Sequence, residues 1–416
     1  MDESFLWGVM AHKALMSAGL SCDLIRSEDV KGGRLREYSL LFVPGGWASN
    51  KVKSLGNDGI EEIKRFVNDG GAYLGFCGGA GLATMDGIGL VPVRRRPTKE
   101  RVPSFSGRIK LNVNDHPLWE NVSGCKAVHS EIRNPKSEMI FHAWWPSQFV
   151  IDGNSVAVLA AYGEAMPDSF SSDVNVGDAE AAGSWPQLES IYRINLDPKR
   201  LLNEPAIIEG AFGKGKVLLS LVHFDTPGDG NGTMMLQRLW EYFGVDSPQK
   251  SVTEPASREG QFSVAAHDPI LSELEAVVDD LVNLGLLNFL GFWRNAMLLQ
   301  WWRGVRGLEY CTLFIMVHEL ASVLRSRSPE NEGRSTGENL DHIRGLLLLF
   351  VGKAKQLLVR ERFAMQNAPI TYERCDDPEM QTVRDELFSR SKSHGGLFKE
   401  LLDELDRLLY SAMTSG

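Results

Sequence analysis

The sequence has few cysteines, no excess of basic residues and no spacing typical of a metal site. Its 416 residues include five cysteines, none in a CxxC pair, which argues against a disulfide framework and against zinc binding. The formal net charge of −10 argues against a nucleic-acid partner, because binding phosphates requires a clustered excess of Lys and Arg. We therefore expect no metal, no cofactor and no nucleic acid.

Long hydrophobic runs and targeting signals are also lacking. The most apolar long segment, residues 281–302, is interrupted by asparagines and Arg294 at intervals too short for a membrane-spanning helix. Asp2 and Glu3 occupy positions where a secretory signal carries basic residues. These absences predict a cytoplasmic protein with no membrane partner.

One basic cluster stands out against the acidic net charge. It consists of Arg94, Arg95, Arg96, Lys99 and Arg101. An anion site over the mouth of an active site is one interpretation. A solvated loop paired with local acids is the favoured one, so we assign the cluster no role.

What is present is the composition and periodicity of a two-domain globular protein. Hydrophobic residues make up 43% and charged residues 24%, as in chains that bury a sizeable core. Residues 1–245 alternate short β-rich runs with helical segments, which predicts an α/β domain with a doubly wound, mostly parallel, flavodoxin-like sheet. Residues 246–267 are polar and form a predicted linker, and residues 268–416 show the periodicity of an all-α helical bundle.

The α/β pattern can be divided into individual elements. Predicted strands cover residues 38–44, 72–76, 109–113, 155–162, 206–212 and 217–222, and predicted helices cover 59–68 and 233–243. The glycines of the Gly213-Lys214-Gly215-Lys216 segment predict a hairpin turn into the last strand. No strand precedes the helical pattern of residues 5–18, so either the sheet lacks a first strand or the chain begins upstream.

The strand at residues 72–76 runs directly into a cysteine flanked by glycines, Gly75-Phe76-Cys77-Gly78-Gly79. Glycines around a strand-to-helix turn let a nucleophile project while nearby backbone N–H groups bind an oxyanion. Cys77 is therefore the candidate nucleophile. The alternatives are a small buried apolar residue and, more weakly, a redox-sensing thiol.

The candidate base and its orienting acid follow another strand, as His223 and Asp225. Asp225 is placed to accept one ring proton of His223 and so to leave the other nitrogen for the thiol. His129 and His142 remain alternative bases or substrate contacts.

A glycine turn after the strand at residues 38–44, Pro44-Gly45-Gly46, predicts a second part of the oxyanion site. The N–H groups of Gly45 and Gly46 would act with that of Gly78. Three tryptophans are candidate walls of a substrate pocket, Trp47, Trp144 and Trp145.

These motifs resemble the class I glutamine amidotransferase-like superfamily and, within it, the N-terminal amidotransferase-like domain of eukaryotic-type biotin protein ligases. The resemblance covers about residues 1–245 and implies that Cys77 is nucleophile, His223 base and Asp225 orienting acid. Asp225 stands where the superfamily has glutamate. The chain has no Gly-Arg-Gly-Arg-x-Gly segment, so the resemblance does not imply biotinylation.

Two functions remain open on the sequence. The first is a cysteine-dependent hydrolase or amidotransferase-like enzyme that acts on an amide or acyl substrate. The second is a noncatalytic regulatory or scaffolding module that binds a small ligand and whose helical bundle binds a protein partner. An Asp225 too distant from His223 would favour the second.

Overall fold

In the computed structural model the described residues are 2–120, 139–245, 268–327, 334–367, 371, 377–390 and 394–414. The chain divides into two compact units. The α/β unit is Met10–Ser251, and the helical unit combines Val252–Gly416 with Met1–Val9, which the sequence analysis assigned to the first domain. The predicted linker, residues 246–267, lies outside the described residues.

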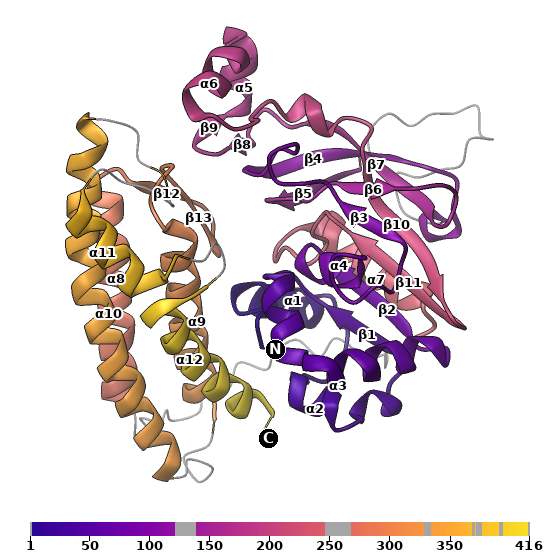
Figure 1. The fold of residues 1–416 in the computed structure, drawn as a ribbon. Helices are drawn as coiled ribbons and strands as arrows, with labels where there is room; N and C mark the ends of the chain where they lie inside the picture. The colour runs from indigo at the N-terminus through magenta and orange to yellow at the C-terminus, as the bar shows by residue number, and fades with distance from the viewer. Residues whose placement is uncertain are drawn as a thin grey trace. The chain divides into compact units, whose positions relative to one another are not determined.

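The α/β unit is built on a mixed sheet, to which nine strands contribute within the described residues (Figure 1). Its order is β1 (Leu40–Val43), β2 (Ala72–Phe76), β11 (Gly215–Ser220), β10 (Pro205–Phe212), β7 (Ala157–Ala165), β4 (Phe105–Val113), β8 (Phe170–Ser171) and β9 (Val174–Asn175), with β5 (Ile140–Trp144) also pairing with β4. A separate pair joins β3 (Val93–Arg95) to β6 (Phe149–Ile151).

The predicted α/β class is confirmed, but the sheet is mixed rather than mostly parallel. Strands β1, β2 and β11 pair in parallel, whereas β11 with β10, β10 with β7 and β7 with β4 pair antiparallel. The turn at Gly213, whose φ is 59°, forces the β10–β11 pair to be antiparallel because a short turn cannot support a parallel crossover. The three parallel strands bring their carboxyl ends to one edge, where the candidate residues lie.

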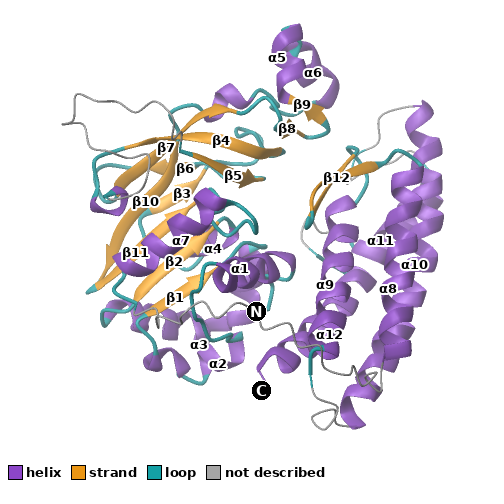
Figure 2. Ribbon diagram, turned by 180° about the vertical axis from the view of Figure 1, so that it is seen from behind, coloured by secondary structure: helices purple, strands orange, loops and turns teal. Residues whose placement is uncertain are grey.

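Helices flank this sheet (Figure 2). They are α1 (Leu6–Ser17), α2 (Ser27–Lys31), α3 (Ala48–Asn68), α4 (Gly78–Ala83), α5 (Val176–Ala182), α6 (Trp185–Tyr192) and α7 (Gly230–Tyr242), with short 3₁₀ turns at Arg34–Glu37, Pro117–Trp119 and Pro198–Leu201. Helix α3 begins earlier than the predicted segment at residues 59–68, since the chain is helical on both sides of a kink at Gly56.

Aromatic side chains pack the core directly beneath the end of β2. Phe76 is fully buried and meets the rings of Phe42 and Phe224 edge to face, at centroid separations of 4.9 and 5.6 Å. Such contacts add to the burial of apolar area and fix the rings in one arrangement. The residue that precedes Cys77 is therefore held by β1 and by the segment that follows β11.

The helical unit contains α8 (Asp268–Leu287), α9 (Gly307–Arg325), α10 (Arg334–Asn367), α11 (Pro378–Phe388) and α12 (Gly396–Thr414). The unit is not all-α as predicted for residues 268–416, because β12 (Gly291–Asn295) and β13 (Leu298–Trp301) form a hairpin after Leu287. Trp301 packs against glycines from three elements, and a Cβ at Gly307 would overlap its indole. Every residue of β13 is buried, which explains why this segment is apolar enough to be predicted as part of a helix.

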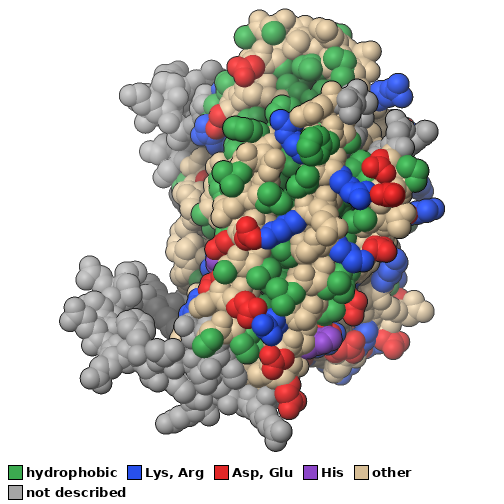
Figure 3. All heavy atoms as spheres, turned by 90° about the vertical axis from the view of Figure 1, so that its left-hand side faces the viewer, with side chains coloured by type: hydrophobic (Ala, Val, Ile, Leu, Met, Phe, Trp, Pro, Cys, Tyr) green, Lys and Arg blue, Asp and Glu red, His purple; other side chains and the backbone are tan. Residues whose placement is uncertain are grey.

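Within the described residues, α9 is the one helix long and apolar enough to cross a membrane, and 67% of its apolar window is buried by protein. That burial is typical of the central helix of a bundle. The face of the helical unit in Figure 3 shows apolar side chains interspersed with charges of both signs.

Candidate active site

Cys77 lies at the turn between β2 and α4, as the glycine pattern predicted. Its backbone has φ 48° and ψ −103°, a conformation that is rare for a residue with a side chain. Its N–H donates to the carbonyl of Ser220 on β11 at 2.8 Å, and its carbonyl accepts from Gly81 at 2.9 Å. Strain at a turn persists where surrounding structure over-determines it, and here both neighbouring elements fix the position of the thiol.

The glycines around Cys77 are required by contact with the turn after β1. A Cβ at Gly78 would overlap the carbonyl oxygen of Gly46, and one at Gly79 would overlap that of Val43. Gly46 itself has φ 113°, which favours glycine. The two predicted parts of the oxyanion site are therefore in direct backbone contact.

His223 and Asp225 follow β11 and are fully buried. The distance from His223 Nδ1 to Asp225 Oδ1 is 2.9 Å, so the shorter aspartate does reach the imidazole. The backbone N–H of His223 donates to the carbonyl of His142 at 2.7 Å, which joins the end of β11 to β5. The ring is thus held by its side-chain partner and by its own backbone.

The environment of His223 stabilises the imidazolium. Burial lowers its pKa by desolvation, but the charge and hydrogen bond of Asp225, followed by those of Cys77, outweigh burial and raise the pKa to about 10. Because Asp225 engages Nδ1, Nε2 is the ring nitrogen left for the thiol. His223 therefore carries a proton at neutral pH between a carboxylate and a thiol.

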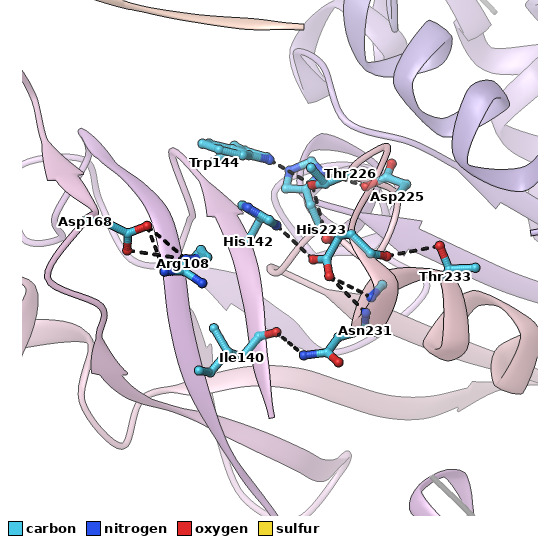
Figure 4. A network of polar contacts seen from close by, with 12 residues as sticks. Arg108, Ile140, His142, Trp144, Asp168, His223, Asp225, Thr226, Asn231 and Thr233 are labelled. Atoms are coloured by element: carbon cyan, nitrogen blue, oxygen red, sulfur yellow. Dashed lines mark hydrogen bonds and ion pairs between the residues drawn. The ribbon is translucent and has the colours of Figure 1, made fainter. Parts of the chain in front are cut away.

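Trp144 and Thr226 connect this group to β5 (Figure 4). The Cys77 thiol donates to the carbonyl of Trp144 at 3.9 Å, and the indole of Trp144 donates to Thr226 Oγ1 at 3.0 Å. The Thr226 hydroxyl lies 3.4 Å from the carbonyl of His223. Trp144 is buried, so it lies in the packed interior beside these candidate residues.

His142 forms a second histidine–aspartate pair with Asp229, and the backbone of His142 contacts that of His223, which lies beside it in Figure 4. His142 Nδ1 is 2.9 Å from Asp229 Oδ2, and the ring of His142 stacks on Trp144 at 5.1 Å. Asp229 also accepts from the backbone N–H groups of Asn231 and Gly232, which makes it the N-cap of α7. The sequence analysis missed Asp229 as an N-cap because it predicted this helix to begin at residue 233, whereas α7 begins at Gly230.

Two other predicted pocket residues, Trp47 and Trp145, adjoin residues of the site, and the ring centroids of Trp145 and Trp144 are 6.4 Å apart. Trp47 is 37% exposed and precedes α3, directly after Gly46. Trp145 has φ 50° and donates its N–H to Phe105 at 2.8 Å. His129 lies outside the described residues. Across the parts of the chain that the structure describes, no group of three or more His, Cys, Asp and Glu side chains could hold a metal ion.

The basic cluster divides into paired and less paired members. Arg96 contacts both carboxylate oxygens of Glu204 at 3.1 Å, and Arg95 lies 3.7 Å from Asp86, as expected for a loop paired with local acids. Arg101 differs, since it is half-buried, donates to the Ser147 hydroxyl at 2.6 Å and interacts electrostatically with Cys77. No sequence pattern other than the cluster itself pointed to Arg101.

A comparison with known protein families finds a match in the part of the chain that contains the turn between β2 and α4 at Cys77. The family described as "Biotin-protein ligase, N terminal" matches residues 34–86. That stretch contains β1, the Pro44-Gly45-Gly46 turn, β2, Cys77 and α4, and it ends well before His223.

Two curated relatives show a similar level of identity. The chain is 26% identical over 129 residues to phosphoribosylformylglycinamidine synthase subunit PurQ of Methanococcus maripaludis, covering 28% of this chain and 42% of that protein. It is 26% identical over 117 residues to pyridoxal 5'-phosphate synthase subunit PdxT of Pyrococcus abyssi, covering 25% of this chain and 59% of that protein. The chain thus spans about half the length of the curated relatives it matches.

Similar solved structures include a glutamine amidotransferase, with 20% identity and a TM-score of 0.32, covering 56% of this chain and 93% of that one. PurLQS from Thermotoga maritima has 15% identity and a TM-score of 0.31, covering 49% of this chain and 80% of that one. The family match and the curated relatives, together with the strand-to-helix turn at Cys77, support the similarity of the α/β unit to the class I glutamine amidotransferase-like superfamily.

Proposed function

We propose that the protein is a cysteine-dependent hydrolase or amidotransferase-like enzyme that attacks an amide or acyl carbon through Cys77, His223 and Asp225. The observation that carries this proposal is the buried imidazole of His223, held by Asp225 at 2.9 Å and interacting with Cys77 on its other side. A nucleophile, a base and an orienting group in this order form the arrangement needed for acyl transfer.

The first step is attack by the Cys77 sulfur, as thiolate, on the carbonyl carbon. The carbonyl oxygen becomes an oxyanion, for which the N–H groups of Gly78 and of the Gly45-Gly46 turn are the proposed donors. His223 then gives its proton to the leaving nitrogen, the C–N bond breaks, and an amine or ammonia departs. The product of this half-reaction is a thioester on Cys77.

Water completes the reaction. Neutral His223 accepts a proton from the attacking water, the C–S bond breaks, and the thiolate and protonated imidazole are restored together with a carboxylic acid. Asp225 keeps the Nδ1 proton in place throughout, so that the other ring nitrogen faces the reacting atoms.

A trapped acyl-enzyme is the direct test of this proposal. The protein would be mixed with L-glutamine and with a panel of simple amides and activated esters, quenched in acid, and its mass measured intact and after digestion. We expect an acyl adduct on the peptide that contains Cys77, absent in Cys77→Ser and retained in Cys22→Ser. Cys22 is a matched control, because burial raises its pKa to about 11. Absence of any adduct from every substrate class would contradict the proposal.

A protein partner for the helical unit is a second proposal, supported by apolar side chains that remain exposed near the end of α8. Leu287 is 78%, Phe289 77% and Trp302 51% exposed. Apolar side chains gathered on a surface are typical of interaction sites. Light scattering of the full chain and of Phe289→Asp would show whether this surface joins two copies, with loss of an assembly in the variant as the expected result and an unchanged monomer as the contradicting one.

A further inference from the structure

Helix α10 carries exposed apolar side chains in addition to those that it packs into the helical unit. It contacts α8, α11 and α12 (Figure 2). On the side that these helices leave uncovered, Leu348 is 43%, Leu349 52%, Val359 41% and Phe363 64% exposed. A helix of a folded unit normally has polar side chains on such a side, so these residues mark an interaction surface.

The residues of this surface follow one another along a single side of α10. We call the surface the outer face of α10, and its exposed members recur at intervals of three and four residues: Gly345, Leu348, Leu349, Gly352, Gln356, Val359 and Phe363. Residues at that spacing lie above one another on an α-helix. The outer face is about 27 Å long, so a second helix can lie along it.

Two glycines occupy the outer face at positions where the interior of a helix favours alanine or larger residues. Gly345 and Gly352 both have nothing within 4 Å of an added Cβ, so no contact among the described residues requires glycine at either position. Glycine also destabilises the interior of a helix relative to alanine. A second helix that crosses α10 here would supply a reason for them, because glycine lets two backbones approach closely.

The pattern of small and large residues on the outer face matches an antiparallel copy of itself. Gly345, Gly352 and Val359 are spaced by seven residues and therefore form one row along α10. When a second α10 runs antiparallel and crosses at Gly352, Val359 of each chain lies opposite Gly345 of the other. A branched side chain then fills the space that a glycine leaves open, at two symmetric points.

The charges along one edge of the outer face match the same antiparallel arrangement. Four residues at intervals of seven form this edge: Asp341, Leu348, Lys355 and Arg362. Lys355 pairs with a carboxylate of α8, whereas neither Asp341 nor Arg362 forms a salt bridge among the described residues. The antiparallel copy brings Asp341 of each chain opposite Arg362 of the other, and a parallel copy would instead oppose like charges.

We propose that two copies of the chain associate through the outer face of α10, with the two helices antiparallel and crossing at Gly352. The occupant is a second copy because the face is complementary to itself. Its shape is complementary at Gly345 and Val359, and its charge is complementary at Asp341 and Arg362. This association is independent of the reaction proposed for Cys77, and it is measured without a substrate.

Sedimentation velocity of the full chain, at protein concentrations from about 1 to 100 μM, measures the association directly. We expect a native dimer within this range. Leu349→Glu should raise its dissociation constant by about tenfold or more, because the added charge is buried in both chains. Ile191→Glu is the matched control and should associate as native protein does, since Ile191 is 53% exposed on α6. A native protein that stays monomeric, or equal weakening by the two variants, would overturn the proposal.

Cysteine substitutions locate the crossing point. A short bis-maleimide should link two chains of Gly352→Cys, because the two copies of this position are adjacent at the crossing. It should not link Val359→Cys, because the two copies of that position are about 21 Å apart on either side of the crossing. Peptide mass spectrometry identifies the linked positions, and native protein controls for the existing cysteines. Equal linkage of both variants, or none of Gly352→Cys, would overturn the crossing at Gly352.

Charge reversals test the pairing of Asp341 with Arg362. Asp341→Arg and Arg362→Asp should each weaken the dimer by about fivefold at low ionic strength, because like charges then meet at two symmetric points. Both changes in one chain should restore native association. Within a single chain the two residues are about 30 Å apart along α10, so restored affinity reports a contact between chains. A double variant that associates as weakly as the single variants would overturn the antiparallel pairing.

Phe289→Asp distinguishes the outer face from the exposed surface near the end of α8. A dimer that is lost in Phe289→Asp and unchanged in Leu349→Glu would assign the contact between copies to the end of α8, and would overturn the proposal. Loss of the dimer in Leu349→Glu, with the fold retained by far-ultraviolet circular dichroism, supports the outer face whatever the effect of Phe289→Asp.

Discussion

The charge on His223 is the residue-level feature on which the proposed chemistry depends. Its imidazolium lies in a fully buried position that would disfavour a charge if Asp225 were absent. The arrangement is stable because Asp225 and Cys77 surround the ring. The same interactions that poise the site therefore contribute to folding.

This coupling predicts a stability that depends on pH. Folding raises the pKa of His223 from 6.5 to about 10, so the folded protein keeps a proton that the unfolded chain releases. The contribution of His223 is complete below pH 6.5 and is lost as the pH rises through about 10. Between pH 7 and pH 9 the native protein should lose on the order of 2–3 kcal/mol more unfolding free energy than His223→Gln. Urea unfolding followed by tryptophan fluorescence measures both, and equal losses would contradict the prediction.

The sequence identified Cys77, His223 and Asp225 because each follows an apolar strand in a recognisable local pattern. It named Arg101 only as a member of the basic cluster, to which it assigned no role, and it did not identify Tyr162. Tyr162 reads as one more apolar position within β7, and only the packed structure shows that its buried hydroxyl has no partner among the described residues. Contacts between residues far apart in sequence have no local signature, which is why these residues were missed.

At the scale of elements, the turn that carries Cys77 between β2 and α4 depends on backbone contact between the turn after β1 and the start of α4. That contact occurs at Gly78 and Gly46, with no space for a side chain. The position of Cys77 therefore depends on how the parallel strands pack at this contact.

Gly78→Ala tests this contact. The added methyl would overlap the carbonyl oxygen of Gly46, which belongs to backbone and cannot rotate away. We expect a loss of about 1–3 kcal/mol in unfolding free energy and a clear fall in the alkylation rate of Cys77. Gly345→Ala, on an exposed surface of α10 with nothing within 4 Å of the added methyl, should instead be neutral or stabilising. Similar behaviour of the two variants in thermal unfolding and alkylation would contradict this interpretation.

Helices α10 and α11 are joined by a buried ion pair. Arg384 Nη2 lies 2.7 Å from Glu361 Oε1, and both side chains are almost completely buried. Glu361→Ala should cost about 3–5 kcal/mol of unfolding free energy, because it leaves the charge of Arg384 buried without its counter-ion.

The neighbouring Arg360 provides the control for Glu361. Its pair with Glu379 is exposed, at 2.8 Å, so Arg360→Ala should cost less than about 1 kcal/mol. Denaturation monitored by far-ultraviolet circular dichroism compares the two variants. Comparable losses in both would show that burial of the Glu361 pair is not important for stability.

The type of an element was predicted correctly where its hydrophobic periodicity is strong. The prediction failed where a buried strand has an apolar sequence that resembles that of a helix. Residues 72–76 form the predicted strand, and the hairpin into β11 occurs at the predicted glycines. The segment after Leu287 was included in the predicted all-α bundle because its apolar residues recur at helical spacing. In the structure they form a hairpin whose second strand, β13, is buried, and Trp301 packs on glycines that a sequence pattern cannot relate to it.

At the scale of the whole molecule, the chain forms two compact units that do not follow the order of the sequence. The first nine residues belong with the helical unit, where Glu3 pairs with Lys399 at 2.9 Å. The ring of Phe5 meets His394 at 5.6 Å and is 2% exposed. A linear reading of the sequence has no means to detect a segment that joins a unit more than 200 residues away.

Phe5→Ala should therefore destabilise the helical unit. Removing a buried phenylalanine ring leaves a cavity and should cost about 3–5 kcal/mol of unfolding free energy. Met16→Ala, in α1 and 45% exposed, should change stability by much less. Thermal loss of helical signal at 222 nm gives the readout, and an unchanged midpoint in Phe5→Ala would exclude Phe5 from the core of this unit.

The measurement that tests the central claim most directly is the pH dependence of iodoacetamide alkylation at Cys77, followed by mass spectrometry in native protein and in His223→Ala. Cys22 serves as an internal reference, since its raised pKa of about 11 keeps it a thiol at neutral pH. The proposed pair of thiolate and imidazolium predicts a native rate that stays high well below the ordinary thiol pKa of about 8.5 and falls in His223→Ala. A slow native rate that follows ordinary thiol titration, unchanged in the variant, would contradict a nucleophile activated by His223.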